Sequence, residues 1–177
     1  MIETARLILR PWTDGDRAPL AAMHADPEVM WDQGGPIDRA ASDAKLDRYQ
    51  AAIDRLGFGR WGLEDTEGAF VGYTGVTPAR PGHVLGEHLE VGWRLVRPAW
   101  GRGYAIEAAR ASLDHVLAMA DVDEVLSYTA SDNLRSQAVM ARLGLRRDPT
   151  RDFVNSYEDA PSWAGLVWVA AQTIQPS

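Results

Sequence analysis

The stretch from Leu95 to Ala105, which reads LVRPAWGRGYA, connects a predicted strand directly to a predicted helix. Apolar side chains alternate with other residues from His88 to Leu95, which predicts a strand, and residues Tyr104 to Ala120 place apolar side chains at helical spacing. Gly101 and Gly103 lie in the turn between them. The first helical turn has backbone N–H groups without partners, and glycine allows a bulky anion to approach them. The turn therefore predicts a phosphate or pyrophosphate ligand, with a tight connection that binds nothing as the alternative.

Two common phosphate-binding motifs do not fit this turn. A nucleoside-triphosphate P-loop needs Gly-Lys before Ser or Thr, but the only lysine, Lys45, follows Ala44. A dinucleotide fingerprint needs glycine or alanine at its third position, where this chain has Ile106. The turn on its own therefore indicates a phosphate group without identifying the molecule that carries it.

The rest of the chain predicts a mixed α/β fold around a mostly antiparallel sheet. Strands are expected at Leu7–Arg10, Arg60–Glu64, Phe70–Val76, Leu89–Leu95, Glu124–Ala130 and Leu166–Ala171. Helices are expected from the turn Thr13–Asp16 to His24, and at Arg39–Leu56, Tyr104–Ala120 and Leu134–Leu143. No repeat or linker divides the sequence, so residues 1–177 are expected to form one domain.

Composition restricts the function as well. The chain has 177 residues with a formal net charge of −7 and no cysteine. The absence of cysteine excludes disulfides, thiolate nucleophiles and cysteine-bound zinc, and the four histidines lack metal-ligand spacing, so no metal is expected. The acidic surplus disfavours nucleic acid as a partner. Without a long apolar run or a signal sequence, we expect a soluble cytoplasmic protein with no membrane partner.

Several motifs together resemble one enzyme family. EVGWRL at Glu90–Leu95, followed by WGRGYAIEA at Trp100–Ala108, resembles the acetyl-CoA signature of the GCN5-related N-acetyltransferases. TARLILR at Thr4–Arg10 resembles the opening strand of the branch that contains the ribosomal-protein N-terminal acetyltransferases, and DPEVM at Asp26–Met30 resembles the exit of its first helix. NLRS at Asn133–Ser136 resembles its second cofactor motif. The resemblance covers nearly the whole chain.

The resemblance implies acetyl-CoA as cosubstrate and a sheet, covered by helices on both faces, that splays open beside its fourth strand. In that arrangement Leu95 and Val96 pair with the pantetheine arm, and Asn133 and Ser136 flank the thioester. The pyrophosphate lies in the turn, which is formed by residues Arg97, Gly101, Arg102, Gly103, Tyr104 and Ala105. The implied acceptor is a primary amine, either a protein N-terminus or a small molecule, and a homodimer is compatible with the resemblance.

Three positions depart from the family pattern. Trp100 stands where most members have glutamine or arginine, Leu145 stands where phenylalanine is usual, and Met140 stands where a tyrosine often serves as general acid. The resemblance implies that Ser136 bonds the departing sulfur, as the serine at this position does in the ribosomal-protein branch, with a plain first-turn helix hydroxyl as the alternative. Tyr128, near Asn133 at the end of its strand, is the substitute acid, and an ordinary half-buried strand tyrosine is its alternative. A non-catalytic acyl-CoA-binding module is the alternative function, because such a module keeps the phosphate turn without an acid.

Glu90 is the candidate general base because it lies on the strand that leads into the expected cleft. A solvated strand carboxylate is the alternative for this residue. Since the chain has no cysteine, we expect direct transfer rather than an acyl-cysteine intermediate. Trp31 and Trp163 lie in irregular segments and are expected to shape the acceptor pocket.

Four arginines are expected to form a positive collar around the turn. Arg94, Arg97, Arg102 and Arg110 are accompanied only by Glu107 within residues 94–110. Glu107 is expected to make an ion pair within the helix, with Arg110 three residues on, or a cap interaction. The acidic surplus in the rest of the chain fits a cationic amine as acceptor.

Overall fold

The computed structural model describes residues 1–119, 122–157 and 160–171. The strands are β1 (Ile2–Glu3), β2 (Leu7–Arg10), β3 (Arg60–Asp65), β4 (Phe70–Pro78), β5 (Leu89–Leu95), β6 (Glu124–Ala130), β7 (Arg146–Arg147), β8 (Phe153–Tyr157) and β9 (Ala160–Ala171). The α-helices are α1 (Arg17–His24), α2 (Pro27–Met30), α3 (Arg39–Leu56), α4 (Tyr104–Met119) and α5 (Leu134–Arg142). Short 3-10 helices are η1 (Asp14–Asp16), η2 (Trp31–Gln33), η3 (Arg97–Ala99) and η4 (Pro149–Arg151).

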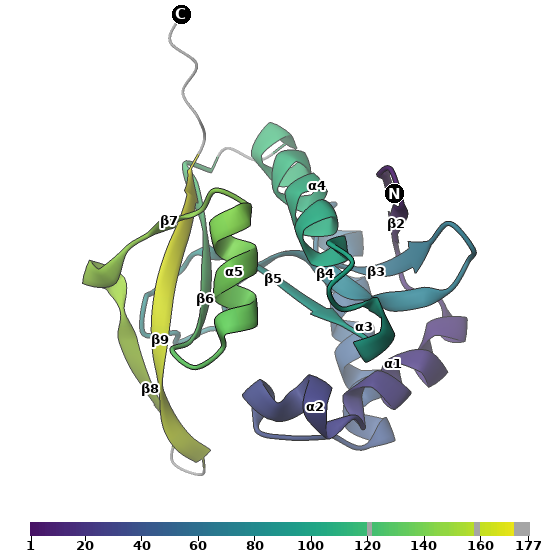
Figure 1. Cartoon of the computed structure of the whole chain (residues 1–177), viewed down its shortest axis with the longest axis horizontal. Coiled ribbons are helices and arrows are strands. Elements are labelled where there is room, and N and C mark those ends of the chain that lie inside the picture. The colour runs from purple at the N-terminus through teal and green to yellow at the C-terminus, as the bar shows by residue number, and fades with distance from the viewer. Residues whose placement is uncertain (120–121, 158–159, 172–177) are drawn as a thin grey trace, which may run out of the picture.

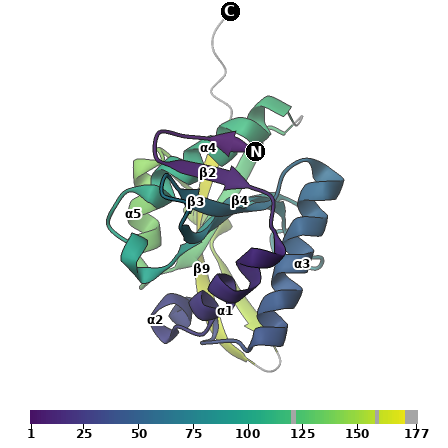
Figure 2. The same ribbon diagram turned by 90° about the vertical axis from the view of Figure 1, so that its right-hand side faces the viewer.

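The nine strands form one sheet in the order β1-β2-β3-β4-β5-β6-β9-β7, and β8 also pairs with β9. Among the described strands, every pairing is antiparallel except the one between β5 and β6. Helices cover both faces, with α4 and α5 on one side and α1 and α3 on the other (Figure 1, Figure 2). The predicted mixed α/β fold with a mostly antiparallel sheet is confirmed.

Strands β5 and β6 separate after a short contact. Seven registered pairs hold β5 to β4, whereas β5 and β6 share one registered pair, Glu90 and Leu126. Figure 1 shows the two strands diverging, with α5 packed beside β6. The C-terminal half of β5 therefore has a strand neighbour on one side only, and it leads directly through η3 into the start of α4.

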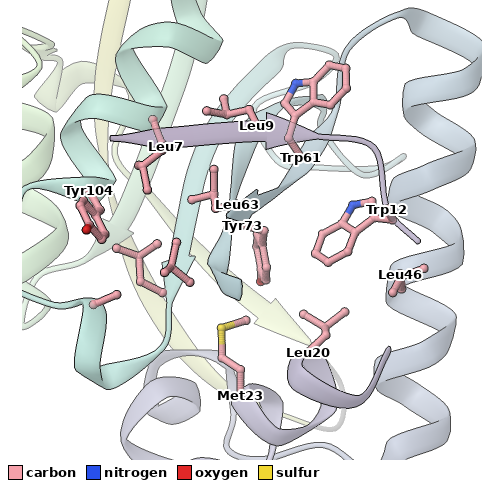
Figure 3. Packing of buried hydrophobic residues seen from close by; sticks show 14 of the residues in the cluster. Leu7, Leu9, Trp12, Leu20, Met23, Leu46, Trp61, Leu63, Tyr73 and Tyr104 are labelled. Carbon is pink, nitrogen blue, oxygen red and sulfur yellow. The ribbon is translucent and has the colours of Figure 1, made fainter. Parts of the chain in front are cut away.

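A buried cluster connects α1 and α3 to the N-terminal strands (Figure 3). Leu7 and Leu9 of β2 are both buried because alternate side chains of a strand point to the same face. Trp12, which follows β2, donates its indole N–H to the carbonyl oxygen of Arg60 over 2.6 Å. Tyr73 of β4 points into the same cluster. Trp12 and Tyr73 fix α1 and α3 against the face of the sheet that carries the even-numbered side chains of β5, whereas Leu7 and Leu9 point to the face that carries Leu95 and packs on α4.

The last strand is longer than the sequence predicts. It begins at Ala160 rather than at Leu166, and it pairs with β8, which the sequence does not predict. Residues 161–165 contain a proline and a glycine, which disfavour a strand locally, so the pairing with β8 stabilises a segment of low intrinsic preference. Ala120, the predicted end of the helix α4, lies outside the described residues.

Candidate active site

The glycine turn has the geometry that an anion site requires. Gly101 has φ of 74° and Gly103 has φ of 80°, a left-handed region that glycine adopts without strain. A side chain on Gly101 would meet no atom within 4 Å, so the space beside its Cα is open. Gly103 directly precedes α4 and has no side chain to cap the helix. The N–H groups of the first turn have no intrahelical partners, and with open space beside Gly101 this position suits a phosphate.

Arg6 braces the turn, although the sequence does not predict a role for it. Its guanidinium donates to Arg102 O over 2.8 Å and binds Glu107 over 2.7 Å. Two guanidinium groups lie over the aromatic ring of Tyr104, Arg6 at 5.0 Å and Arg102 at 4.7 Å from its centroid. Because Tyr104 is buried, its side chain anchors the helix start and leaves only its backbone for a ligand.

The predicted pair between Glu107 and Arg110 is wrong. Glu107 accepts hydrogen bonds from Thr4 over 2.7 Å and from Arg6, whereas Arg110 donates to Leu143 O over 2.6 Å. Burial acts to raise the pKa of Glu107, but the hydrogen bonds from Thr4 and Arg6 lower it overall. The N-terminal segment, which is remote in sequence, supplies partners that the helix spacing alone does not reveal.

The predicted collar of four arginines is also wrong for two of its members, Arg94 and Arg97. Arg94 binds Asp32 over 2.8 Å. Arg97 binds two carboxylates over 2.7 Å each, Asp26 just before α2 and Glu28 within α2. Arg97 is therefore not a free cation for the cofactor. Within residues 1–119, 122–157 and 160–171, no ion pair engages Arg102.

A second cation near the turn comes from α5. The guanidinium of Arg135 lies 4.4 Å from the ring centroid of Trp100, and in the described part of the chain it too has no carboxylate partner. Trp100 in turn donates its indole N–H to Leu95 O over 2.9 Å. The tryptophan that replaces the usual polar residue therefore links the turn, the end of β5 and α5.

The open edge of β5 presents backbone groups to the gap beside β6. The N–H of Val96 donates to the carbonyl oxygen of Val71 on β4 over 3.1 Å. On the other side of β5, the hydroxyl of Ser127 on β6 donates to the carbonyl oxygen of Val91 over 3.0 Å. Because successive residues of a strand direct their N–H groups to alternate sides, the N–H groups of Trp93 and Leu95 face away from β4. The prediction for Val96 is corrected, since its N–H is already used within the sheet. Trp93 takes its place as the second open donor.

Asn133 and Asp32 connect the second cofactor motif to β5. Asn133 caps α5 by accepting the N–H of Ser136 over 3.1 Å, and its amide donates to Asp32 over 3.1 Å. The other carboxylate oxygen of Asp32 accepts from Arg94 over 2.8 Å. Both polar groups of the buried Asn133 are therefore engaged in holding α5 to the segment after α2. The half-buried Ser136 makes no hydroxyl hydrogen bond within the described residues, so that hydroxyl is open to a ligand.

Glu90 is held by a buried arginine. Arg60 on β3 donates to Glu90 over 2.8 Å and to Gly75 O over 2.5 Å. A side chain at Gly92 would lie 2.7 Å from the same guanidinium, so glycine at this position makes room for the pair. The Glu90 side chain remains 23% exposed, which leaves it accessible to an acceptor.

The two candidate acids lie on opposite faces of β6. Tyr128 packs with Leu126 and Phe153, whereas Ser136 belongs to α5, which packs on the face that buries Val125. Tyr128 therefore faces the same side of the sheet as Glu90, as alternation from the Glu90–Leu126 pair requires. Ser136 and Tyr128 are alternatives rather than partners.

An aromatic cluster surrounds Tyr128. His83 stacks on it at 5.0 Å, and Phe153, His88 and Trp163 lie at 5.4, 5.9 and 6.5 Å between ring centroids. Burial and then His88 lower the pKa of His83, while Glu90 opposes this effect, so these groups lie close together. The sequence does not predict that His83 and His88 lie beside Tyr128, because the segment that carries them has no recognisable motif.

The structure also places Met140 and the two tryptophans that the sequence analysis singles out. Met140 is 1% exposed and belongs to the core cluster with Val125 and Leu143, so a proton donor is absent at that position. Trp163 joins the aromatic cluster, whereas Trp31 is 46% exposed beside Asp32.

Across the described residues, no group of three or more acidic or histidine side chains could hold a metal ion. None of the described helices combines the length and hydrophobicity needed to cross a bilayer.

Known proteins share this architecture. Residues 6–146 match the model of a family described as acetyltransferase (GNAT) domain. The chain is 32% identical over 167 residues to the FsC-acetyl coenzyme A-N(2)-transacetylase of Aspergillus fumigatus, which covers 90% of this chain and 70% of that protein. An acetyltransferase crystal structure from Agrobacterium tumefaciens shares 28% identity at a TM-score of 0.78, covering 97% of this chain and 94% of that one. The ribosomal-protein acetyltransferase RimL, in complex with coenzyme A, shares the fold at 12% identity and a TM-score of 0.72, with 95% of each chain covered.

Proposed function

Since the chain belongs to the GNAT acetyltransferase family, we propose that it transfers the acetyl group of acetyl-CoA directly to a primary amine. The observation that carries this proposal is the continuity between the open edge of β5 and the glycine turn at the start of α4. One end of this surface offers backbone donors to a pantetheine arm, and the other offers helix N–H groups to a pyrophosphate.

Acetyl-CoA supplies a thioester, whose acetyl carbon an amine attacks while the thiolate departs. The N–H of Trp93 or Leu95 faces the gap and can stabilise the negative charge that develops on the acetyl oxygen. Gly101, Gly103 and the first turn of α4, with Arg102 and Arg135 beside them, are suited to a pyrophosphate.

Glu90 is our candidate for the group that accepts the proton of the amine, directly or through water. Its pairing with Arg60 fixes the carboxylate, and its partial exposure leaves it within reach of an acceptor. Ser136 is our candidate for stabilising the departing sulfur, because its hydroxyl is uncommitted among the described residues. Tyr128 is the substitute, on the acceptor side of β6.

The buried Met140 favours a second candidate, an acyl-CoA-binding module without turnover. Release of free thiol from acetyl-CoA in the presence of N-terminal peptides, polyamines and amino acids distinguishes the two. Thiol release with formation of an N-acetylated product supports the enzyme. Tight binding of acetyl-CoA without product across the panel supports the module. We also propose that the protein is cytoplasmic and can form a homodimer. Sedimentation of the purified chain tests the homodimer.

A further inference from the structure

The aromatic cluster around Tyr128 is assembled from separate segments of the chain. His83 and His88 come from the segment before β5, Tyr128 from β6, Phe153 from β8 and Trp163 from β9. Between ring centroids, His83 stacks on Tyr128 at 5.0 Å and meets Phe153 edge-to-face at 5.1 Å. Trp163 meets Phe153 edge-to-face at 5.4 Å. Rings in these arrangements attract one another beyond the effect of burying their surface, so the cluster is an organised group of rings.

Gly165 of β9 gives the Phe153 ring its position. The two residues are directly paired between β8 and β9, and a Cβ at Gly165 would lie 2.4 Å from the Phe153 ring. The ring therefore occupies the space that a side chain at Gly165 would fill, and from there it reaches Tyr128 at 5.4 Å between centroids. The glycine thus allows β8 to contribute a ring to the cluster on β6.

The two histidine rings are oriented by their own loop. Nδ1 of His83 accepts the N–H of Leu85 over 3.2 Å, and Nδ1 of His88 donates to the carbonyl oxygen of Gly86 over 3.0 Å. Burial and then His88 lower the pKa of His83 from its ordinary value of 6.5, while Glu90 opposes this effect. His83 is therefore neutral at pH 7, so it acts as an aromatic ring and does not repel an ammonium group.

The aromatic cluster borders the candidate base, Glu90. The N–H of Ala79 donates to the carbonyl oxygen of His88 over 2.8 Å, so the ladder between β4 and β5 continues through His88. The His88 side chain therefore lies on the same face as Glu90, about 7 Å along the strand. Tyr128 is on this face too, two residues after Leu126, the partner of Glu90 on β6. An amine at Glu90 is thus flanked by rings from both strands.

Part of the aromatic cluster is open to a ligand. In the described part of the chain, the core cluster that includes Tyr128 is built from strand residues and Leu85, without a helical residue. Phe153 is 9% exposed, whereas the other four rings are half-buried. Aromatic surface that stays accessible beside a reactive group is typical of a binding site.

We propose that the aromatic cluster binds an aromatic group of the acceptor, so that the acceptor is a primary amine with an aromatic ring close to its nitrogen. This inference rests on the proposed function and names the substrate class of the same site. A planar ring gains stacked and edge-to-face contacts with the cluster, which a saturated ring of the same size does not. Both a free arylalkylamine and a protein N-terminus with an aromatic first residue have this chemistry.

Matched amines that differ only in the saturation of one ring test the inference. The pairs are phenethylamine and cyclohexylethylamine, and the tripeptides phenylalanyl-glycyl-glycine and cyclohexylalanyl-glycyl-glycine. Burial alone favours the saturated member, which is the more hydrophobic. By calorimetry at pH 7 with coenzyme A, which has no acetyl group to transfer, we expect the aromatic member of at least one pair to bind about fivefold more tightly or better. A preference in the first pair identifies a small-molecule amine, and one in the second pair identifies a protein N-terminus.

Two substitutions at His83 separate the ring from its hydrogen bond. His83→Leu removes the ring stacked on Tyr128, whereas His83→Phe keeps a ring, and both remove the acceptor for the N–H of Leu85. We expect the affinity ratio to fall about threefold or more in His83→Leu and to stay within about twofold of wild type in His83→Phe. His115→Leu on α4 is the control, because it also replaces a histidine beside an aromatic ring, Trp61 at 6.2 Å.

Equal affinities within both pairs, an unchanged ratio in His83→Leu, or a ratio lost in His83→Phe would overturn the inference. The wild-type comparison needs no variant, so it tests the inference even where a substitution destabilises the fold. An aromatic preference without acetyl transfer from acetyl-CoA supports the aromatic site and contradicts the proposed function. Acetyl transfer without the preference contradicts the aromatic site alone.

Discussion

Arg60 donates to Glu90 over 2.8 Å from beneath Gly92, where a side chain would collide with the guanidinium. The Arg60 side chain is 10% exposed, so the pair is largely shielded from water. A second nitrogen of Arg60 donates to Gly75 O on β4. The orientation of the Glu90 carboxylate is therefore set by β3 and β4 together, just before β5 separates from β6.

Removing the carboxylate of Glu90 tests its role as base. We expect Glu90→Gln to lower kcat by about tenfold or more near pH 7, and less at higher pH, where the amine is already neutral and needs no base. A pH–rate profile from pH 6 to about 10 measures this. Glu67→Gln, on the exposed hairpin turn between β3 and β4, is the control. A profile of Glu90→Gln that follows the wild type throughout would remove Glu90 from the mechanism.

Adding a methyl group at Gly92 tests whether Arg60 positions Glu90. The new Cβ would lie 2.7 Å from one guanidinium nitrogen and 2.9 Å from the other, so Arg60 must move. We expect Gly92→Ala to lower kcat several-fold while the KM for acetyl-CoA stays within about twofold. Gly15→Ala, whose Cβ would make only an ordinary contact with Thr13, serves as the control. An unchanged kcat in Gly92→Ala would show that the pair does not position the base.

Substitutions at two glycines with the same backbone conformation, Gly101 and Gly82, distinguish an effect on fold stability from an effect on acetyl-CoA binding. Gly101 has φ of 74° and Gly82 has φ of 78°, and a side chain at either would meet open space. We expect Gly101→Gln and Gly82→Gln each to destabilise the fold by about 1–2 kcal/mol, because both force a left-handed residue. Only Gly101→Gln is expected to weaken acetyl-CoA binding, by about tenfold or more in calorimetry. Equal affinities for acetyl-CoA in the two variants would contradict the phosphate turn.

The buried His24 makes stability depend on pH. Burial, and then Lys45 and Arg94, lower the pKa of His24 from 6.5 to about 4. Because the folded-state pKa lies below the unfolded value, this contribution is complete above pH 6.5 and is lost as pH falls toward 4. The loss amounts to about 3 kcal/mol.

Urea unfolding at pH 7 and at about pH 4.5 measures this contribution in wild type, His24→Asn and the control His115→Asn. As the pH is lowered, the free energy of unfolding is expected to decrease less in His24→Asn than in the wild type. In His115→Asn it is expected to decrease as much as in the wild type. Carboxylates whose pKa the fold lowers, such as Glu107, are common to all three proteins. The same pH dependence in His24→Asn and wild type would contradict a neutral buried His24.

Local features of the site can be predicted from the sequence. The glycine turn depends on residues that are adjacent in the chain, and the cap at Asn133 depends on a spacing of three. Helix α3 is predicted with its observed bounds from the helical spacing of its apolar side chains, and the structure places Asp38 at its N-cap and Gly57 at its C-cap. Each of these rests on residues that lie close together in the chain.

Partners from remote segments cannot be predicted in this way. Arg6 reaches Glu107 across 101 positions, and Asn133 reaches Asp32 across the same separation. Two arginines of the predicted collar, Arg94 and Arg97, are therefore neutralised by carboxylates of Asp26, Glu28 and Asp32, which the sequence does not place beside them. Val96 is misassigned for a related reason, because the side to which a strand residue directs its N–H depends on register, which the sequence alone leaves open.

The most direct test of the account measures thiol release and amine acetylation in one reaction. Wild-type protein, acetyl-CoA and the preferred amine are expected to yield free thiol and N-acetylated amine in equal amounts, with little of either in Gly101→Gln. Acetyl-CoA that binds the wild-type protein but yields no acetylated amine from any primary amine tested would contradict the account.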